Sequence, residues 1–143
     1  MISYFRKHAL VFAWIVAWLG FFGSLYFSEV QHLQPCILCW YQRIAMYPLV
    51  IIIGLIIWEP IKRFRSFILP FSVTGLVIAI YQNLLYYKII PESIAPCVSG
   101  VSCTQKTIEW LGFITIPMLS AVGFLVITAL VLLARPAQSN ELH

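Results

Sequence analysis

Charged residues are scarce in this sequence. Its 143 residues include nine Lys and Arg and five Asp and Glu, so 10% of the chain is charged, whereas about 25% is usual in a soluble domain. Hydrophobic residues make up 62%. This composition excludes a soluble globular domain and indicates an integral membrane protein. The basic residues flank apolar runs instead of forming one patch, so we interpret them as topology signals of a protein in the lipid bilayer and expect no nucleic-acid partner.

The sequence also predicts no removable leader. The first apolar run, Ala9 to Ser28, is too long for a signal-peptide core, and no small-x-small cleavage site follows it. We interpret this run as a retained membrane span.

Three further runs lack charge: Ile44–Trp58, Ser66–Tyr87 and Trp110–Ala134. The run from Ile44 to Trp58 would span only about 22 Å as a helix, less than the ~30 Å hydrocarbon core. Its helix must therefore begin earlier, near Cys39, which places Arg43 about one turn inside the outer boundary. The other helices are expected over about 67–87 and 114–134. The sequence predicts an all-α membrane protein whose residues 1–143 form one four-helix transmembrane domain, with a disordered polar tail over 136–143.

The distribution of Lys and Arg predicts the orientation. Six of them fall on one side of the predicted spans and three on the other, where Glu29, Glu92 and Glu109 balance them. By the positive-inside rule, the six-residue side is cytoplasmic. Both termini are then inside, and two cysteine-bearing loops are outside, in the compartment where disulfides persist.

Cys36 and Cys39 form a Cys-x-x-Cys pair at the predicted start of the second helix. The free N–H groups of a helix N-terminus favour a thiolate, and Cys39 gains most if the helix starts there. Arg43 lies four residues later, on the same helical face as Cys39. A charge at the edge of the hydrocarbon is usually there for a partner, and a thiolate or an anionic reduced cofactor would serve. The alternative is that Arg43 only reaches up to the headgroups.

Cys97 and Cys103 lie in the second outer loop, separated by Val98-Ser99-Gly100-Val101-Ser102. Four cysteines allow three pairings, so the connectivity stays open. A four-cysteine zinc site is an alternative, but the second spacing is loose and an oxidising compartment disfavours thiolate ligands. Two structural disulfides are another alternative, although a Cys-x-x-Cys bridge closes very little loop. Gln82, a polar residue near the outer end of the third span, is a candidate for a pocket.

The combination of these motifs resembles the DsbB family of disulfide-forming membrane proteins, especially its BdbC branch. The shared segments are Leu25-Tyr26-Phe27-Ser28-Glu29, Cys36-Ile37-Leu38-Cys39-Trp40-Tyr41-Gln42-Arg43, Pro96-Cys97-Val98-Ser99-Gly100 and Gly112-Phe113-Ile114-Thr115-Ile116-Pro117. The resemblance covers nearly the whole chain, except for the polar tail.

The resemblance implies a four-helix bundle in the bacterial cell (inner) membrane, with a quinone (ubiquinone or menaquinone) as electron acceptor. It implies a DsbA-like (BdbD-like) thioredoxin-fold thiol oxidase outside the membrane as electron donor. Cys97 would form the mixed disulfide with this partner. Cys103 would then attack Cys36, so that Cys39 is released as a thiolate beside the quinone. Arg43 matches the family's arginine near the quinone.

One difference from the enterobacterial members is the shorter spacing of Cys97 and Cys103, which leaves less loop to reach Cys36. Two other functions stay open. One is a quinone reductase resembling vitamin K epoxide reductase, although there the redox pair lies near the last span of the bundle. The other is a membrane scaffold or metal-binding protein with structural cysteines.

Overall fold

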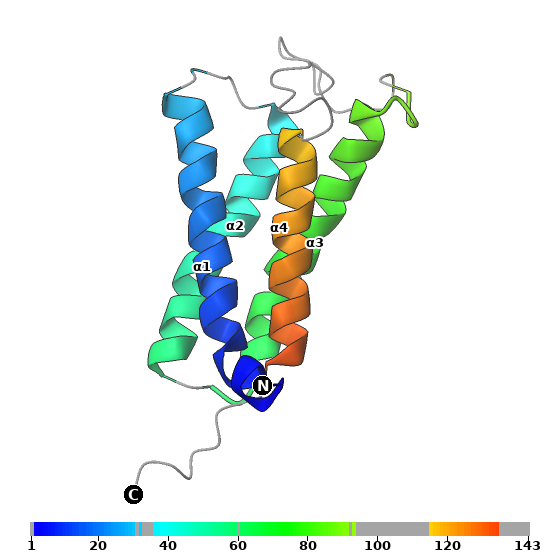
Figure 1. Ribbon diagram of the computed structural model, residues 1–143. Coiled ribbons are helices and arrows are strands. Elements are labelled where there is room, and N and C mark those ends of the chain that lie inside the picture. The colour runs from blue at the N-terminus through cyan, green and yellow to red at the C-terminus, as the bar shows by residue number, and fades with distance from the viewer. Residues whose placement is uncertain are drawn as a thin grey trace, which may run out of the picture.

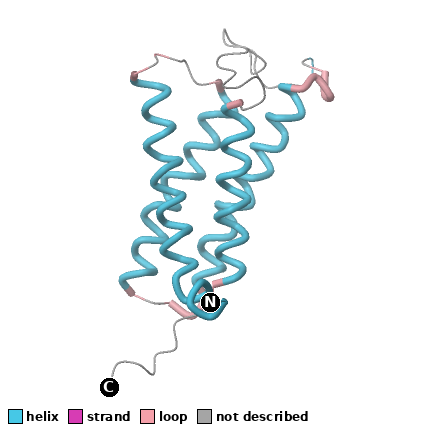
Figure 2. Tube along the Cα trace, viewed as in Figure 1, coloured by secondary structure: helices cyan, strands magenta, loops and turns pink. Residues whose placement is uncertain are grey.

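The described part of the chain folds into four helices. The computed structural model describes residues 2–30, 32, 36–59, 61–91, 93 and 115–134. These residues form α1 (Ile2–Glu29), α2 (Ile37–Trp58), α3 (Phe64–Tyr86) and α4 (Ile116–Leu133), and the described part contains no strand (Figure 2). Each helix is long and apolar enough to cross a membrane. For the described residues, the prediction of an all-helical fold with four helices long and apolar enough to span a membrane is therefore confirmed.

The helices alternate in direction along a single bundle (Figure 1). Each helix packs against the next in sequence, and α4 closes the ring by packing against α1. At one end of the bundle α1 ends, α2 begins, α3 ends and α4 begins (Figure 1). Both chain segments that carry cysteines connect helices at this end. The cysteines at 97 and 103 themselves lie outside the described residues.

The observed helix boundaries differ from the predicted ones by a few residues. α2 begins at Ile37, two residues before the predicted start, and Cys36 is its N-cap residue with an extended backbone. Arg43 therefore lies almost two turns into the helix instead of one. The nearest charged residues on either side lie too far apart to mark where the helix begins. The charge pattern therefore placed the start too late and left out Ile37 and Leu38, which extend the apolar helix.

Two helix ends near the cysteine pair are capped in recognisable ways. At the end of α3 the N–H of Ile89 donates to the Leu84 carbonyl at 3.0 Å and that of Lys88 to Leu85 at 3.0 Å. This is a Schellman motif, in which Lys88 takes the left-handed conformation with φ 56°. At the start of α4 the Thr115 hydroxyl accepts from the Met118 N–H at 3.3 Å.

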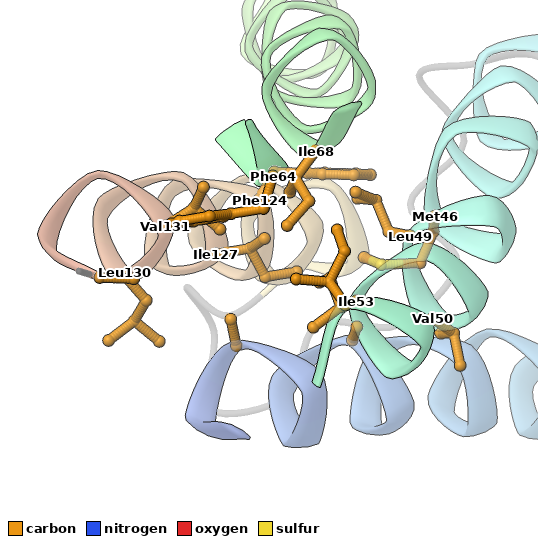
Figure 3. Close-up of a cluster of buried hydrophobic side chains, with 14 of the residues drawn as sticks. Met46, Leu49, Val50, Ile53, Phe64, Ile68, Phe124, Ile127, Leu130 and Val131 are labelled. Carbon is orange, nitrogen blue, oxygen red and sulfur yellow. The ribbon is translucent and has the colours of Figure 1, made fainter. Parts of the chain in front are cut away.

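The main core lies between the helices, below the cysteine end. Figure 3 shows its largest side chains, which come from α2, α3 and α4. α1 contributes small residues instead: Ala9, Ala13 and Ala17 are fully buried at four-residue spacing. Small side chains let two helix backbones approach closely, which is how helices associate when lipid removes the hydrophobic driving force.

The helices α3 and α4 pack so closely at one position that no Cβ atom fits there. A Cβ atom placed on Gly75 would lie less than 3.0 Å from atoms of the Phe124 ring, so only glycine leaves room for that side chain. One turn away, the Ser72 hydroxyl bonds the Thr128 hydroxyl, and Thr128 donates to the Phe124 carbonyl at 2.7 Å. Since Thr128 uses its proton there, Ser72 is the donor between the two helices.

Candidate active site at the head of α2

The Cys-x-x-Cys pair is brought together by the first turn of α2. The sulfurs of Cys36 and Cys39 lie 3.1 Å apart and share a hydrogen bond, and both thiols are free. A disulfide bond is about 2.05 Å long, so closing the pair needs a movement of only about 1 Å. The arrangement is therefore a dithiol poised to form a disulfide.

The pair is sheltered by an apolar cluster at the α2–α3 contact. Cys36, Leu38 and Leu85 are buried together, and the half-buried members packed against them are Cys39, Ile78, Tyr81 and Ile90. The hydrogen bond to Cys39, followed by this burial, raises the pKa of the Cys36 thiol above its usual range. Cys36 therefore keeps its proton and donates it toward Cys39.

Gln82 reaches the sulfurs from α3. Its Nε2 lies 3.3 Å from the Cys39 sulfur and 3.5 Å from the Cys36 sulfur, and the residue is only 3% exposed. A buried amide must be hydrogen-bonded to offset its loss of water, and here the sulfurs serve as acceptors. An N–H donor aimed at sulfur favours the thiolate over the thiol.

Gln42, also buried, lies on the other side of the Gln82 amide. Its Nε2 donates to the Gln82 Oε1 at 2.6 Å, which joins α2 to α3. The sequence prediction did not single out this residue. Two signals were available: an amide in an apolar helix, one turn after Leu38 and next to Arg43, and its place in the segment Cys36–Arg43 that carries the family resemblance.

Arg43 is half-buried on α2 and points toward α1. Its guanidinium donates to the Ser24 carbonyl at 2.9 Å and lies 5.6 Å from the centre of the Trp40 ring. This contact ties the heads of α1 and α2 together. A guanidinium has five N–H donors, so one bond to a carbonyl leaves others available.

The neighbouring amide of Asn83 is used differently. It donates to the Ala79 carbonyl at 2.7 Å and to the Pro117 carbonyl at 2.8 Å, which joins α3 to the first turn of α4. Asn83 thus holds the outer ends of α3 and α4 together without contacting either sulfur among the hydrogen bonds described.

The predicted site residues divide into two groups. The structure brings Cys36, Cys39 and Gln82 into direct contact, with Arg43 one turn from Cys39. Cys97 and Cys103 lie outside the described residues. The described residues contain no group of three or more His, Cys, Asp or Glu side chains that could hold a metal ion.

Comparison with known proteins places the chain in a family. The model for "Disulfide bond formation protein DsbB" matches residues 6–134. The chain belongs to the DsbB family. It is 42% identical over 137 residues to disulfide bond formation protein C of Bacillus subtilis, covering 94% of this chain and 99% of that protein. It is 41% identical over 134 residues to a probable disulfide formation protein of Chlamydia caviae, covering 94% and 96%. No solved structure shows a significant match.

The family assignment confirms the resemblance seen in the sequence. A DsbB-family chain is an oxidoreductase for disulfide bond formation and a multi-pass membrane protein. The dithiol at the head of α2 is chemically suited to that activity, because a dithiol and a disulfide interconvert by exchange with other thiols.

Proposed function

We propose that this chain reoxidises an extracytoplasmic thioredoxin-fold thiol oxidase and passes the electrons to a membrane quinone. The observation that carries the proposal is the Cys36–Cys39 dithiol, buried at Cys36 and half-buried at Cys39, with the Gln82 amide donating toward both sulfurs. The cysteine loops face the outside of the bacterial cell membrane and both termini face the cytoplasm, as the basic residues predict.

The exchange steps need no group beyond thiols. In each step a thiolate attacks one sulfur of a disulfide, one S–S bond forms and one breaks, and the displaced sulfur leaves as a thiolate. Starting from Cys97–Cys103 and Cys36–Cys39 disulfides, the partner's thiolate attacks Cys97, forms a mixed disulfide and displaces Cys103. The Cys103 thiolate attacks Cys36 and displaces Cys39, and the partner's second thiolate then breaks the mixed disulfide, so that the partner leaves oxidised. The freed Cys97 attacks Cys103, which re-forms the Cys97–Cys103 disulfide and leaves Cys36 and Cys39 reduced.

A terminal electron acceptor is required, because exchange only transfers electrons from one cysteine pair to another. Closing the Cys36–Cys39 disulfide releases two electrons and two protons, which is what a bound quinone takes up on becoming a quinol. The residues present suit such a group: Cys39 lies at the end of a membrane span, and Arg43 has donors left for a quinone oxygen. We propose Arg43 as the main quinone contact.

The quinone contact predicted for Gln82 stays a prediction. Its described hydrogen bonds go to the two sulfurs and to Gln42, which supports a role in stabilising the Cys39 thiolate. Charge-assisted hydrogen bonds are roughly twice as strong as neutral ones, so the amide would hold the thiolate more firmly than the thiol.

The test is quinone reduction by purified protein supplied with a reduced thioredoxin-fold oxidase. We expect one quinol for each partner disulfide formed, with either ubiquinone or menaquinone, and no turnover by Cys39→Ser. Ser72→Ala, which removes a hydrogen bond between α3 and α4 ten residues before Gln82 on α3, is the control for fold damage and should keep activity. If neither quinone is reduced in a thiol-dependent way, the proposal fails and structural cysteines become the better explanation.

A further inference from the structure

Hydrogen bonds connect Gln42 of α2 through Gln82 of α3 to the two cysteine sulfurs, and this connection suggests a role for Gln42. We infer that Gln42 is a positioning residue: by donating to the Gln82 Oε1, it fixes the Gln82 amide with its N–H groups toward Cys36 and Cys39. This inference rests on the proposed function, because the orientation of the amide matters only if Cys39 acts as a thiolate.

A glutamine amide is nearly symmetric in shape. Its oxygen and nitrogen ends have almost the same size, so packing alone does not decide which end faces a neighbour. Turned one way, Gln82 presents N–H donors to the sulfurs and stabilises a thiolate. Turned the other way, it presents a carbonyl oxygen, which repels a thiolate and can accept only from a thiol S–H.

Gln42 selects between these two orientations. Its Nε2 lies 2.6 Å from the Gln82 oxygen, a short bond between two side chains that are 8% and 3% exposed. While Gln42 keeps its N–H toward Gln82, and with little water at hand, a Gln82 amide turned the other way would place its N–H against that of Gln42 and leave both donors unsatisfied. An unsatisfied buried donor costs more than an ordinary hydrogen bond contributes, so the observed orientation is held.

The position of Gln42 in the helix makes this possible. It lies on α2 one turn after Leu38, a buried member of the cluster around the cysteines, and three residues after Cys39. Residues three and four apart share a helical face, so α2 presents the reactive sulfur and the positioning amide to the same part of α3. One helix thus supplies both the nucleophile and the group that orients its hydrogen-bond donor.

The test uses the rate at which iodoacetamide modifies Cys39 in the reduced, full-length protein at neutral pH, resolved from Cys36 by fragment mass spectrometry. The variants are Gln42→Leu, Gln82→Leu and the double variant. We expect Gln82→Leu to slow Cys39 modification by about tenfold and Gln42→Leu by about threefold to tenfold, the range that one hydrogen bond supports. The double variant should be no slower than Gln82→Leu alone, because Gln42 acts only through Gln82.

Two further variants serve as controls that separate the loss of a hydrogen-bond donor from structural damage. Gln42→Met keeps an unbranched chain of similar length without a donor, and it should behave like Gln42→Leu. Asn83→Leu removes an amide that joins α3 to α4 but bonds no sulfur, and it should leave the Cys39 rate within about twofold. A purely structural role for Gln42 would instead slow modification equally in both backgrounds.

The inference is overturned if Gln42→Leu and Gln42→Met leave the Cys39 rate unchanged, or if the effects of Gln42→Leu and Gln82→Leu multiply in the double variant. Failure of the proposed function looks different. In that case the alkylation pattern is as expected, which supports the positioning role, while the wild-type protein reduces no quinone when given a reduced partner.

Discussion

At the residue scale, the two sulfurs at the head of α2 differ in which one keeps its proton. The hydrogen bond to Cys39 and burial raise the pKa of the Cys36 thiol. A raised pKa lowers the thiolate fraction at neutral pH, and each unit changes that fraction about tenfold. We therefore expect iodoacetamide to modify Cys39 before Cys36 at about pH 7, by roughly tenfold or more. Equal rates, or faster modification of Cys36, would contradict this assignment of the proton.

Arg43 offers a second test at this scale. Removing its guanidinium by Arg43→Ala takes away a charge-assisted donor, so we expect the KM for quinone to rise roughly tenfold or more. Arg43→Lys keeps the charge but loses the planar fork, and it should recover part of that loss. Steady-state kinetics with quinone as the varied substrate checks both variants.

A purely structural role for Arg43 would give a different result. Arg43 bonds the Ser24 carbonyl, so its role could be only to hold α1 against α2. In that case Arg43→Ala would lower the thermal stability of the protein and leave the KM for quinone unchanged.

The sequence identified Cys36, Cys39, Arg43 and Gln82 as candidates, because each is a chemically unusual residue in an apolar chain. It did not identify Gln42, whose importance depends on which residue of α3 it faces. Helical spacing shows which residues share a face of one helix, but not how two helices are rotated about their axes. The Gln42–Gln82 contact, forty residues apart, needed the structure.

At the scale of helices, the close approach of α3 and α4 depends on Gly75. Gly75→Ala would place a Cβ atom less than 3.0 Å from atoms of the Phe124 ring, so the helices must separate or the ring must move. Overpacking of this kind costs about 1–3 kcal/mol, so we expect a clearly lower free energy of unfolding in detergent.

A matched control lies on the facing helix. A Cβ atom placed on Gly123 would meet nothing within 4 Å beyond its own stretch of helix, so Gly123→Ala should be neutral or slightly stabilising. Adding Phe124→Leu to Gly75→Ala should recover part of the loss. If both glycine variants unfold alike, the close packing against Phe124 is not what Gly75 provides.

The helices themselves could be predicted from the sequence, because a long uncharged run in a membrane has few structural alternatives to a helix. The ends of the helices were harder to predict. α2 begins at Ile37 instead of near Cys39, since nothing in the charge pattern marks Cys36 as the N-cap residue. The left-handed Lys88 that ends α3 also has no signal in the sequence, because glycine is the residue expected there.

At the scale of the whole molecule, the proposal requires the cysteine end of the bundle to face outward. Lys62 lies exposed between α2 and α3, and Lys88 lies exposed at the opposite end, after α3. In a chain whose four cysteines are replaced by serine, a membrane-impermeant maleimide should label Lys88→Cys in intact cells. Lys62→Cys should be labelled only after permeabilisation. The reverse pattern would show that the bundle is inserted the other way.

The most direct test of the central proposal is a single turnover without any partner. A Cys97→Ser, Cys103→Ser chain, reduced and held without oxygen, is mixed with excess quinone, and both quinol and the Cys36–Cys39 disulfide are measured. We predict one quinol and one disulfide per chain, and neither in the same chain carrying Cys39→Ser. If no quinol forms, or if the Cys39→Ser chain forms as much, electrons do not reach quinone through the dithiol at the head of α2.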